Sequence, residues 1–501
     1  MAAGDAGDAG DAGGSVAAAA AAESLTARAI SARLERIDVW SLSFLFIGII
    51  GLGFVFTFYD IFDINVSFIQ TCVDLKKGCT PPDALSTIRF PIALNLAGYV
   101  VGALALAPIA DRVGRRQMLM VTMGLTGLAS LYTALAPDYP NFVFARALTG
   151  IGIGADLAIV NTYINEVAPR AARAKYTSVI FFMAAVGAFL GIWLGLILTT
   201  MSEPWPKGLS FAVGGHSFFA PHGTGIVGWR LMYGIGALLA LVAVVLRVGL
   251  PESPRWLVAR RRLAEADEVV RGMETRAARH GPLAEPSIEA VEPLEPQTAQ
   301  PYRDLLASRR YRRRVIVLLV TWAFAYVTVY AFGAGFTSLF AALKYAPPTA
   351  GLITAVGVSG FVVAGICAVL FAERLERRYW LPVCAALTLG GGILAGLSGS
   401  SIALAMIGAG IVFFAFNLWV PMTYAWSAES FPTRARSTGF ALVDGLGHAA
   451  GGIGILLIAP AIPDLGPLPS FILIAAFLVV AAIVAQFGEH TRARRLDEIS
   501  P

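Results

Sequence analysis

The sequence predicts an all-α membrane protein with twelve transmembrane helices, arranged as two pseudo-symmetric six-helix bundles. Three observations predict this fold class. Of the 501 residues, 57% are hydrophobic and 14% are charged, whereas soluble domains carry about 25% charged residues. Apolar stretches of about 20 residues, the length that crosses a bilayer, recur along the chain. Two motifs of the first half also return in the second half, which indicates a duplicated unit.

The predicted spans form two groups of six, separated by a long polar segment. The first six are expected at Val39–Tyr59, Thr87–Ala110, Gln117–Ala136, Phe142–Ile164, Ser178–Thr200 and Trp229–Leu250. The second six are expected at Val315–Phe340, Ala350–Phe371, Leu381–Leu397, Ile402–Trp426, Thr438–Ile458 and Pro469–Gln486. We therefore expect six-helix bundles at 38–250 and 315–487, joined by a cytosolic linker with short helices at 251–314. The N-terminal tail at 1–37 is expected to be disordered, with a helix near Ser24–Arg36 as the alternative. A second cytosolic tail is expected at 488–501.

The distribution of positive charge predicts the orientation. With both termini inside, the inner loops and tails hold 30 Lys and Arg residues, and the outer loops hold four. Because cytoplasmic loops carry the excess of Lys and Arg, we expect both termini in the cytoplasm. The richness in Ala, Gly and Arg favours the plasma (inner) membrane of a bacterium.

The internal repeat rests on two motifs that recur at nearly the same distance. Asp111-Arg-Val-Gly-Arg-Arg116 returns as Glu373-Arg-Leu-Glu-Arg-Arg378, 262 residues later. Glu166-x-x-Pro-x-x-x-Arg173 returns as Glu429-x-x-Pro-x-x-x-Arg436, 263 residues later. Proteins built from such repeats place a binding site near the bilayer midplane, between the halves.

Several function classes are not supported by the sequence. The chain contains no HExxH, GxSxG or GxxxxGK[ST] motif, so neither an enzyme nor an ATP-driven pump is expected. It has no compact group of metal ligands and no basic stripe with interleaved aromatic residues, so we expect no metal, no cofactor and no nucleic-acid partner. Cys72 and Cys79 share a short polar loop and are candidates for a disulfide if that loop faces an oxidising side.

Four segments resemble the major facilitator superfamily. They are Asp111–Arg116, Arg146-x-x-x-Gly-x-Gly-x-Gly154, Pro251-Glu-Ser-Pro-Arg-Trp-Leu257 and Tyr424–Gly439. The third is similar to the signature that sugar porters and organic-ion transporters share, and the fourth is closer to the organic-ion and metabolite:proton branch. Ala107 stands where the first motif usually has Gly, and span 7, Trp322–Gly335, lacks the paired glutamines of sugar porters.

The resemblance implies a monomeric secondary transporter in the lipid bilayer that works by alternating access. We expect it to carry a small polar metabolite, an organic acid, together with protons. A sugar:proton symporter remains the alternative, through the Pro251–Leu257 signature, and so does a uniporter or drug exporter of the same fold.

The charged motifs predict a cytoplasmic gate of ion pairs that part when the transporter opens inward. The candidates are Asp111, Arg115, Arg116, Glu166, Arg173, Glu252, Arg255, Glu429 and Arg436. We expect Glu166 to pair with Arg170 or Arg173, Glu252 with Arg255, and Glu429 with Arg434 or Arg436. The alternative is that these charges only mark topology and form surface pairs, which contribute little to stability.

Arg146 lies within span 4, where an unpaired cation is costly, so it requires an anion. Asp60 and Asp63, at the expected outer end of span 1, share a helix face and are candidates for proton coupling. Ionised Asp60 would pair with Arg146, and protonated Asp60 would release it. Alternatively, Asp63 lies in outer water, or Arg89 is the true partner of either Asp.

Two further intramembrane groups remain open. Asp444 and His448 lie four residues apart in span 11 and form either a second proton relay or a packing contact. Asp156 pairs either with Arg146, through a neighbour, or with another helix. Polar and aromatic side chains inside the spans are candidates for substrate binding, with packing as the alternative for each. They are Tyr59, Asn161, Tyr326, Tyr330, Asn417, Trp419 and Tyr424.

Overall fold

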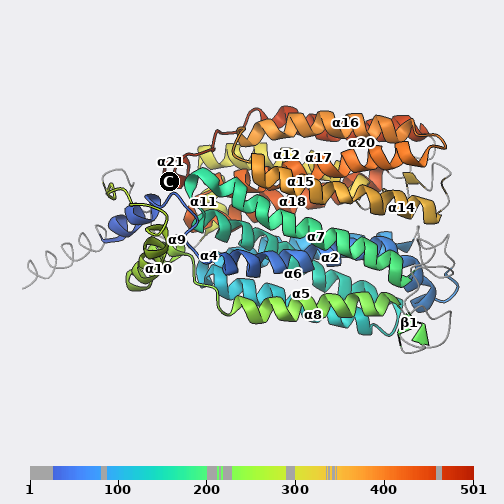
Figure 1. The fold of residues 1–501 in the computed structure, drawn as a ribbon, viewed down its shortest axis with the longest axis horizontal. Coiled ribbons are helices and arrows are strands. Elements are labelled where there is room, and N and C mark those ends of the chain that lie inside the picture. The colour runs from blue at the N-terminus through green and yellow to red at the C-terminus, as the bar shows by residue number, and fades with distance from the viewer. Residues whose placement is uncertain are drawn as a thin grey trace, which may run out of the picture.

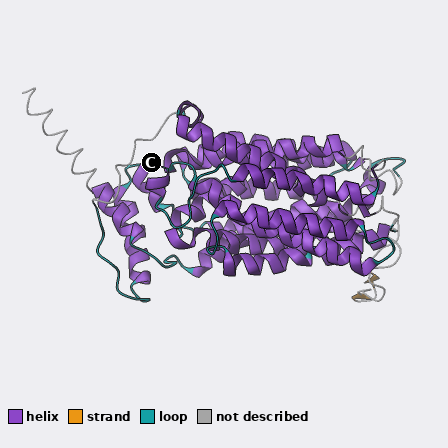
Figure 2. Cartoon of the chain, turned by 90° about the horizontal axis from the view of Figure 1, so that it is seen from above, coloured by secondary structure: helices purple, strands orange, loops and turns teal. Residues whose placement is uncertain are grey.

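The protein is a bundle of long, roughly parallel helices (Figure 1). The computed structural model describes residues 26–79, 87–199, 212–213, 216–217, 228–288, 300–333, 336, 339–340, 345, 347–458 and 465–500. Within these ranges, twelve helices are long and apolar enough to cross a membrane, as the sequence predicts. A pair of two-residue strands, β1 (Ala212–Val213) and β2 (His216–Ser217), lies at one end of the bundle (Figure 2).

The first half of the chain supplies six of these helices, drawn blue to green in Figure 1. They are α2 (Phe44–Leu75), α4 (Arg89–Val113), α5 (Arg115–Leu135), α6 (Tyr139–Val167), α7 (Arg173–Thr199) and α8 (Gly228–Arg247). Charged and turn-forming residues separate them. Gly114, for example, has a φ of 122° between α4 and α5, a conformation that favours glycine.

The second half supplies the remaining spans. They are α12 (Arg309–Gly333), α14 (Pro347–Gly357) with α15 (Ser359–Phe371), α16 (Trp380–Gly396), α17 (Ile402–Glu429), α18 (Arg436–Ile458) and α20 (Pro467–Ala485). The span expected at Ala350–Phe371 thus consists of two helices that meet at Val358. The short helices η1 (Arg170–Ala172), η2 (Arg377–Tyr379) and η3 (Thr433–Ala435) precede α7, α16 and α18. η1 and η3 follow the two copies of the Glu-x-x-Pro motif, in keeping with the repeat.

Helix α2 corrects the predicted end of the first span. The sequence places that end at Tyr59, but α2 has 32 residues and continues to Leu75. Its length is about 48 Å at 1.5 Å per residue. Asp60 and Asp63 therefore lie within the helix and not at its outer end. Their charge ends the apolar stretch in the sequence without ending the helix.

Helices α2, α4, α6 and α7 of the first bundle contact the second bundle, and α6 packs on both α17 and α18. Helix α4 packs on α18, and α7 packs on both α15 and α17. Rings cross the same boundary, because Phe62 of α2 meets Phe361 of α15 edge-on at 5.6 Å between centroids. A cavity between the halves is thus enclosed by helices from both repeats.

Both ends of the described chain lie at one end of the bundle, which we call the termini face. It also carries the linker helices α9 (Pro254–Ala259), α10 (Leu263–Ala277) and α11 (Pro301–Ala307) (Figure 1). The C-terminal helix α21 (Leu496–Ile499) packs on the termini face. Arg314 donates to the Ile499 carbonyl there at 2.8 Å.

The last part of the N-terminal tail follows the alternative expectation, a helix near Ser24–Arg36, and is not disordered. Residues 26–35 are helical, and Arg33 forms ion pairs of 2.6 Å with both Asp267 and Glu274 of α10. Glu35 pairs with Arg255. Burial raises the pKa of Glu35, but Arg255, Arg173 and Arg495 together lower it more, so the pKa lies below its usual value. Residues 1–25 lie outside the described part of the chain.

Candidate functional site

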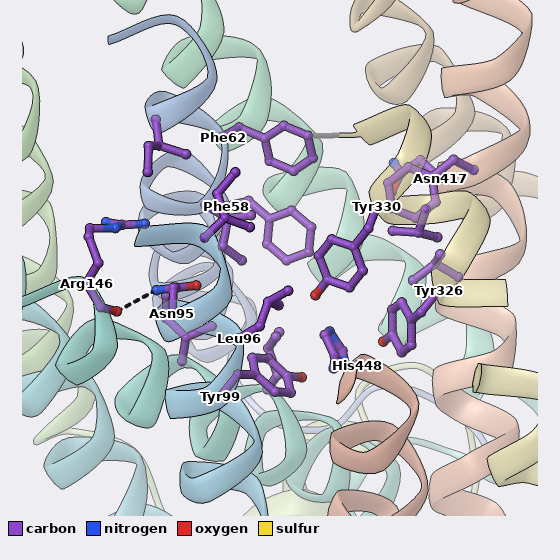
Figure 3. Close-up of a pocket in the computed structure, with 18 of the residues that line it drawn as sticks. Phe58, Phe62, Asn95, Leu96, Tyr99, Arg146, Tyr326, Tyr330, Asn417 and His448 are labelled. Carbon is purple, nitrogen blue, oxygen red and sulfur yellow. Dashed lines mark hydrogen bonds between the residues drawn. The ribbon is translucent and has the colours of Figure 1, made fainter. Parts of the chain in front are cut away.

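A cavity of about 100 Å³ lies between the two halves (Figure 3). Most of its lining is apolar and aromatic, and both repeats contribute. The lining residues with rings are Phe58, Phe62, Tyr99, Phe181, Tyr326, Tyr330, Phe416, Tyr424 and His448. The polar and charged side chains without a ring are Asn95, Arg146 and Asn417. Such a mixture, an apolar wall with few polar groups, is typical of a small-molecule site.

Arg146 forms the charged wall of the cavity on the side of the first half. Its Nη1 donates to Asp60 Oδ2 at 2.7 Å, and its Nη2 donates to the Asp60 carbonyl at 2.9 Å. Asp60 also accepts from the Ser130 hydroxyl at 3.1 Å, and Arg146 lies 5.3 Å from the centre of the Tyr233 ring. The contact between Asp60 and Arg146 is thus the one that the sequence predicts. The side chain of Arg89, the alternative partner, lies outside the described residues.

Asp63 is buried and does not lie in outer water, which corrects one of the two alternatives. It follows Asp60 by three residues on α2 and has no exposed surface. Among the described residues, neither of its carboxylate oxygens has a hydrogen-bond partner. The site therefore holds two carboxyl groups close to the single guanidinium of Arg146.

Asp444 and His448 of α18 lie on the opposite side of the cavity. Asp444 accepts from the hydroxyls of Tyr99 and Tyr326, the latter at 2.6 Å. Tyr99 belongs to α4, so this carboxylate joins the two halves. His448 lies between the two tyrosine rings, stacked on Tyr99 at 3.9 Å and tilted against Tyr326 at 3.8 Å between centroids. Its Nδ1 lies 2.8 Å from the Asp444 backbone carbonyl and 3.5 Å from the carboxylate.

Four of the predicted substrate-binding residues line the cavity, namely Tyr326, Tyr330, Asn417 and Tyr424. Asn417 is held by its amide, which donates to the Phe361 carbonyl at 2.8 Å. The Tyr424 hydroxyl lies 3.0 Å from that of Tyr326.

The other three residues predicted to bind substrate do not line this cavity. Tyr59 donates to the Met232 carbonyl at 3.1 Å, inside the first bundle. Asn161 donates to the carbonyl of Leu157 in its own helix at 2.7 Å. Trp419 packs against Trp322 in the second bundle, with 5.5 Å between ring centroids. For these three, the packing interpretation holds.

The sequence interpretation missed Tyr99 and Asn95, which face the cavity from α4. They lie four residues apart and so share one face of the helix. Asn95 donates to the Arg146 carbonyl at 2.8 Å (Figure 3). Two polar side chains at helical spacing within an apolar span are a signal that could have identified them.

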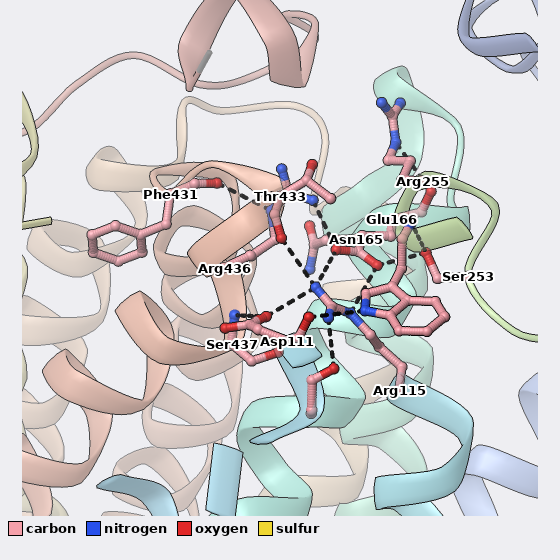
Figure 4. Close-up of polar contacts among 12 residues, drawn as sticks. Asp111, Arg115, Asn165, Glu166, Ser253, Arg255, Phe431, Thr433, Arg436 and Ser437 are labelled. Carbon is pink, nitrogen blue, oxygen red and sulfur yellow. Dashed lines mark hydrogen bonds and ion pairs between the residues drawn. The ribbon is translucent and has the colours of Figure 1, made fainter. Parts of the chain in front are cut away.

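A second polar cluster closes the termini face between the halves (Figure 4). Asp111, at the end of α4, accepts from the backbone N–H and the hydroxyl of Thr438 at 3.0 and 2.7 Å, at the start of α18. Glu166 of the first half pairs with Arg115 at 3.0 Å and with Arg436 of the second half at 3.2 Å. Arg115 also donates to the Thr433 carbonyl at 3.1 Å. These contacts join the halves.

The second repeat contains the equivalent contacts. Arg377 pairs with Glu429 at 3.3 Å, as Arg115 pairs with Glu166. Glu373 accepts from the backbone N–H of Lys175 at 3.1 Å, at the start of α7 in the other half. Lys175 and Thr438 are separated by 263 residues, which is the offset of the sequence repeat. Each half thus caps a helix of the other with a carboxylate.

The pairings expected within the gate are wrong in three cases. Glu166 pairs with neither Arg170 nor Arg173, and Arg173 donates to the Arg494 carbonyl at 2.9 Å. Glu429 pairs with Arg377 and not with Arg434 or Arg436.

The third wrong pairing involves Glu252. It accepts from the backbone N–H groups of Arg115 and Arg116, at 3.0 and 3.2 Å, and not from Arg255. Burial is the main cause that raises the pKa of Glu252. Arg255 instead pairs with Glu35, and Arg116 donates to the Val248 carbonyl at 2.5 Å.

Two further expectations are resolved by direct contacts. Asp156 pairs with Arg247 of α8 at 2.5 Å and accepts from the Thr122 hydroxyl at 2.8 Å, so it pairs with another helix and not with Arg146. Cys72 and Cys79 form a disulfide at the end of the bundle opposite the termini face. Among the described residues, no group of three or more His, Cys, Asp and Glu side chains could hold a metal ion.

Comparison with known proteins identifies the family. Residues 44–501 match the profile of the family described as sugar (and other) transporter. The chain belongs to this family. It is therefore a multi-pass membrane transporter of the major facilitator superfamily and not an enzyme.

Known transport proteins align over most of the chain. YyaJ of Bacillus subtilis, whose name describes a metabolite transport protein, is 28% identical over 93% of this chain and 96% of its own length. The niacin transporter NiaP of Acinetobacter baylyi is 24% identical over 93% of this chain and 99% of its own length. The 4-hydroxybenzoate transporter PcaK of the same organism is 27% identical over 78% of this chain and 79% of its own length.

Solved structures share the fold. The proton:xylose symporter XylE, bound to 6-bromo-6-deoxy-D-glucose, superposes with a TM-score of 0.68 at 20% sequence identity, over 91% of this chain and 98% of that chain. The human organic anion transporter MFSD10 superposes with a TM-score of 0.57 at 14% identity, over 90% of this chain and 99% of that chain. The twelve-helix sugar-transporter fold is thus shared by proteins with different substrates, so the substrate must be argued from the cavity.

Proposed function

We propose that this transporter carries a small aromatic carboxylate together with a proton across a bacterial plasma membrane, with both termini in the cytoplasm. The observation that carries the proposal is the cavity, where nine ring-bearing residues surround a volume of about 100 Å³. A planar aromatic solute can stack on such walls, and each aromatic contact contributes beyond its buried area. The names of NiaP and PcaK, a niacin and a 4-hydroxybenzoate transporter, also point to aromatic acids.

Proton coupling is supported by the buried pair of Asp60 and Arg146. The guanidinium lines the cavity, and its ion-pair partner lies directly behind it. If Asp60 takes up a proton, Arg146 loses that partner and is left as a buried charge, which is unfavourable. The protonated and ionised states of Asp60 therefore favour different arrangements of α2 and α6, as a coupled transporter requires.

Alternating access is supported by the contacts at the termini face. Asp111, Glu166 and Arg436 join the halves there, and the same chain supplies both walls of the cavity. One chain therefore contains a complete site, in keeping with a monomer. Opening toward the cytoplasm would separate these contacts while the cavity stays between the halves.

Sugar:proton symport is the second candidate, favoured by the family description and by the fold shared with XylE. A sugar needs a polar partner for each of its several hydroxyls. Among the described lining residues, the amides of Asn95 and Asn417 are both engaged with backbone carbonyls. The cavity is therefore better suited to an aromatic ring with one polar group.

The test is proton flux in proteoliposomes that contain a pH-sensitive dye. Niacin, 4-hydroxybenzoate, acetate and xylose would be added outside in turn, with protein-free liposomes to correct for passive entry of undissociated acid. We expect the two aromatic acids to acidify the lumen and a protonophore to remove the signal. Acidification by xylose alone would establish sugar symport instead. Radiolabelled exchange without proton flux would establish a uniporter or exchanger.

A further inference from the structure

The cavity offers a carboxylate few positive partners. Among the described lining residues, the basic side chains are Arg146 and His448. Both terminal nitrogens of Arg146 already donate to Asp60, and its Nε is buried. A second anion would have to share with Asp60 a guanidinium whose charge that carboxylate already balances. The charge partner of a bound carboxylate is therefore better sought at His448.

The contacts of His448 fix its tautomer. Nδ1 lies 2.8 Å from the backbone carbonyl oxygen of Asp444. Because a carbonyl oxygen only accepts, Nδ1 must carry the hydrogen. Nε2 is then the nitrogen that gains or loses a proton, and it has no hydrogen-bond partner among the described residues. The residue is 6% exposed and lines the cavity, between Tyr99 and Tyr326 in Figure 3.

The surroundings of the imidazole hold it in place and compensate a positive charge. The titratable side chains in contact with it are Tyr99 from α4, Tyr326 and Tyr330 from α12 and Asp444 from its own helix, and the Tyr424 hydroxyl of α17 lies 3.0 Å from that of Tyr326. The ring cannot turn without breaking its contacts with Tyr99 and Tyr326. The Asp444 carboxylate, which accepts two tyrosine hydroxyls, lies 3.5 Å from Nδ1 and is the acidic group next to the ring.

We infer that Nε2 of His448 binds the carboxylate of the substrate as a charge-assisted N–H···O hydrogen bond. The inference rests on the proposed function. The proton comes from the outer solution and enters on Nε2, and a carboxylate oxygen accepts the hydrogen bond. No covalent bond of the substrate forms or breaks. The proton and the carboxylate bring opposite charges, so the net charge of the site is the same before and after binding. Both are then released on the cytoplasmic side of the membrane.

Protonation and binding are then coupled. The carboxylate raises the affinity of Nε2 for a proton, and the proton raises the affinity of the site for the carboxylate by the same factor. This proton is separate from the one proposed for Asp60. Substitution of Asp60 should therefore alter proton flux without removing the preference of the cavity for a carboxylate.

The experiment compares 4-hydroxybenzoate with 4-hydroxybenzamide, which has the same shape and no charge. Binding of both would be measured on purified protein at about pH 6 and about pH 8, on either side of the range where histidine titrates. We expect the wild type to prefer the carboxylate by about tenfold or more at the lower pH, since hydrogen bonds to charged groups are the stronger ones. The preference should fall at the higher pH.

Two variants separate the charge from the proton. His448→Gln should bind both probes equally at either pH. His448→Lys keeps a cation throughout this range, so it should retain the preference and lose the pH dependence. His280→Gln is the matched control. Its Nδ1 lies 3.3 Å from the Arg276 carbonyl, also four residues earlier, but on the exposed linker. The His280→Gln variant should show the same carboxylate preference and pH dependence as the wild type.

The outcomes are distinct. A His448→Gln protein that keeps the carboxylate preference and its pH dependence overturns the inference, while acid-driven proton flux would still support the proposed function. If neither probe binds and no aromatic acid drives proton flux, the proposed function fails and the inference fails with it. Should the glutamine variant not elute as a folded monodisperse protein, the wild-type pH profile and the lysine variant decide the question.

Discussion

At the scale of single residues, two buried ion pairs have similar chemistry and different surroundings. Asp60 pairs with Arg146 at 2.7 Å, and Asp156 pairs with Arg247 at 2.5 Å. All four side chains are almost fully buried. Arg146 lines the cavity, whereas Asp156 and Arg247 lie within the first bundle, away from the described lining. Position relative to the cavity, and not the ion pair itself, therefore distinguishes a coupling pair from a structural one.

A pair of matched substitutions tests this distinction. Asp60→Asn removes one of the two groups proposed to carry a proton, so the number of protons moved per substrate should fall while exchange of radiolabelled substrate persists. Asp156→Asn should keep proton coupling and lower the stability by about 3–5 kcal/mol, the cost of leaving a buried cation unpaired. Proton flux and thermal unfolding would be measured for both. Full coupling in Asp60→Asn, or loss of coupling in Asp156→Asn, would contradict the assignment.

The sequence can narrow the choice of partner where few charged residues lie within the membrane spans. Arg146 needs an anion, and Asp60 is an acidic residue in a neighbouring apolar stretch, so their contact follows from the cost of an unpaired charge in the membrane. The partners of Glu166 could not be predicted in this way. Several arginines lie near it in the sequence, but packing within the first half brings Arg115 to it, and docking of the two halves brings Arg436. Such contacts depend on tertiary packing.

At the scale of helices, the sequence predicts the number of spans and most boundaries within a few residues. It fails where a helix contains charges that the fold pairs or buries. Helix α2 continues beyond Asp60 because Arg146 compensates that carboxylate. In the same way, α12 begins at Arg309, before the expected Val315, because Arg310 and Arg314 donate to carbonyls of the C-terminal segment. Hydropathy alone cannot detect such partners.

Helices α4 and α6 approach each other so closely that only glycine fits at two positions of their contact. A Cβ on Gly150 would lie 2.0 Å from the carbonyl oxygen of Asn95, and one on Gly102 would lie 1.9 Å from that of Ile151. Both obstacles are backbone atoms, which cannot rotate away. Glycine here is required by the contact between helices, although it lowers helix propensity. The close contact also positions Asn95 and Tyr99 at the cavity.

Gly150→Ala should therefore force α4 away from α6. We expect a loss of stability of about 1–3 kcal/mol, as for overpacking of a core, and weaker binding of the aromatic acid because Asn95 moves. Gly124→Ala is the control. No atom lies within 4 Å of a Cβ at that position, so alanine should stabilise α5 by up to about 1 kcal/mol. Unfolding midpoints and substrate affinity would be compared, and equal effects of the two substitutions would refute the argument.

At the scale of the whole molecule, the repeat in the sequence becomes a reciprocal contact between the halves. Asp111 of the first half binds the N–H of Thr438, and Glu373 of the second half binds the N–H of Lys175. Each carboxylate lies at the N-terminus of a helix, where negative charge is favourable. In the described structure, only one of the two Glu-x-x-Pro glutamates forms an ion pair between the halves. Glu166 pairs with Arg436 of the second half, whereas Glu429 pairs with Arg377 of its own half.

The last prediction concerns the opening of the termini face. Asp111 accepts three hydrogen bonds from Ser437 and Thr438, so its charge stabilises the closed contact between α4 and α18. Asp111→Asn should shift the population toward the state open at this face by about tenfold or more, since charge-assisted bonds are replaced by weaker ones. A cysteine introduced by Ala435→Cys, a buried position in η3, would report the opening through its labelling rate with a thiol probe.

The measurement needs a background without the two free cysteines, Cys367 and Cys384. Glu265→Gln on the exposed linker helix is the matched change of a carboxylate to an amide, and it should leave the labelling rate unchanged. Because both the cavity and the contact at Asp111 are shared by the two halves, a bound aromatic acid should also change the rate in the wild type. An unchanged labelling rate in Asp111→Asn would mean that the carboxylate stabilises the fold without controlling which side of the transporter is open.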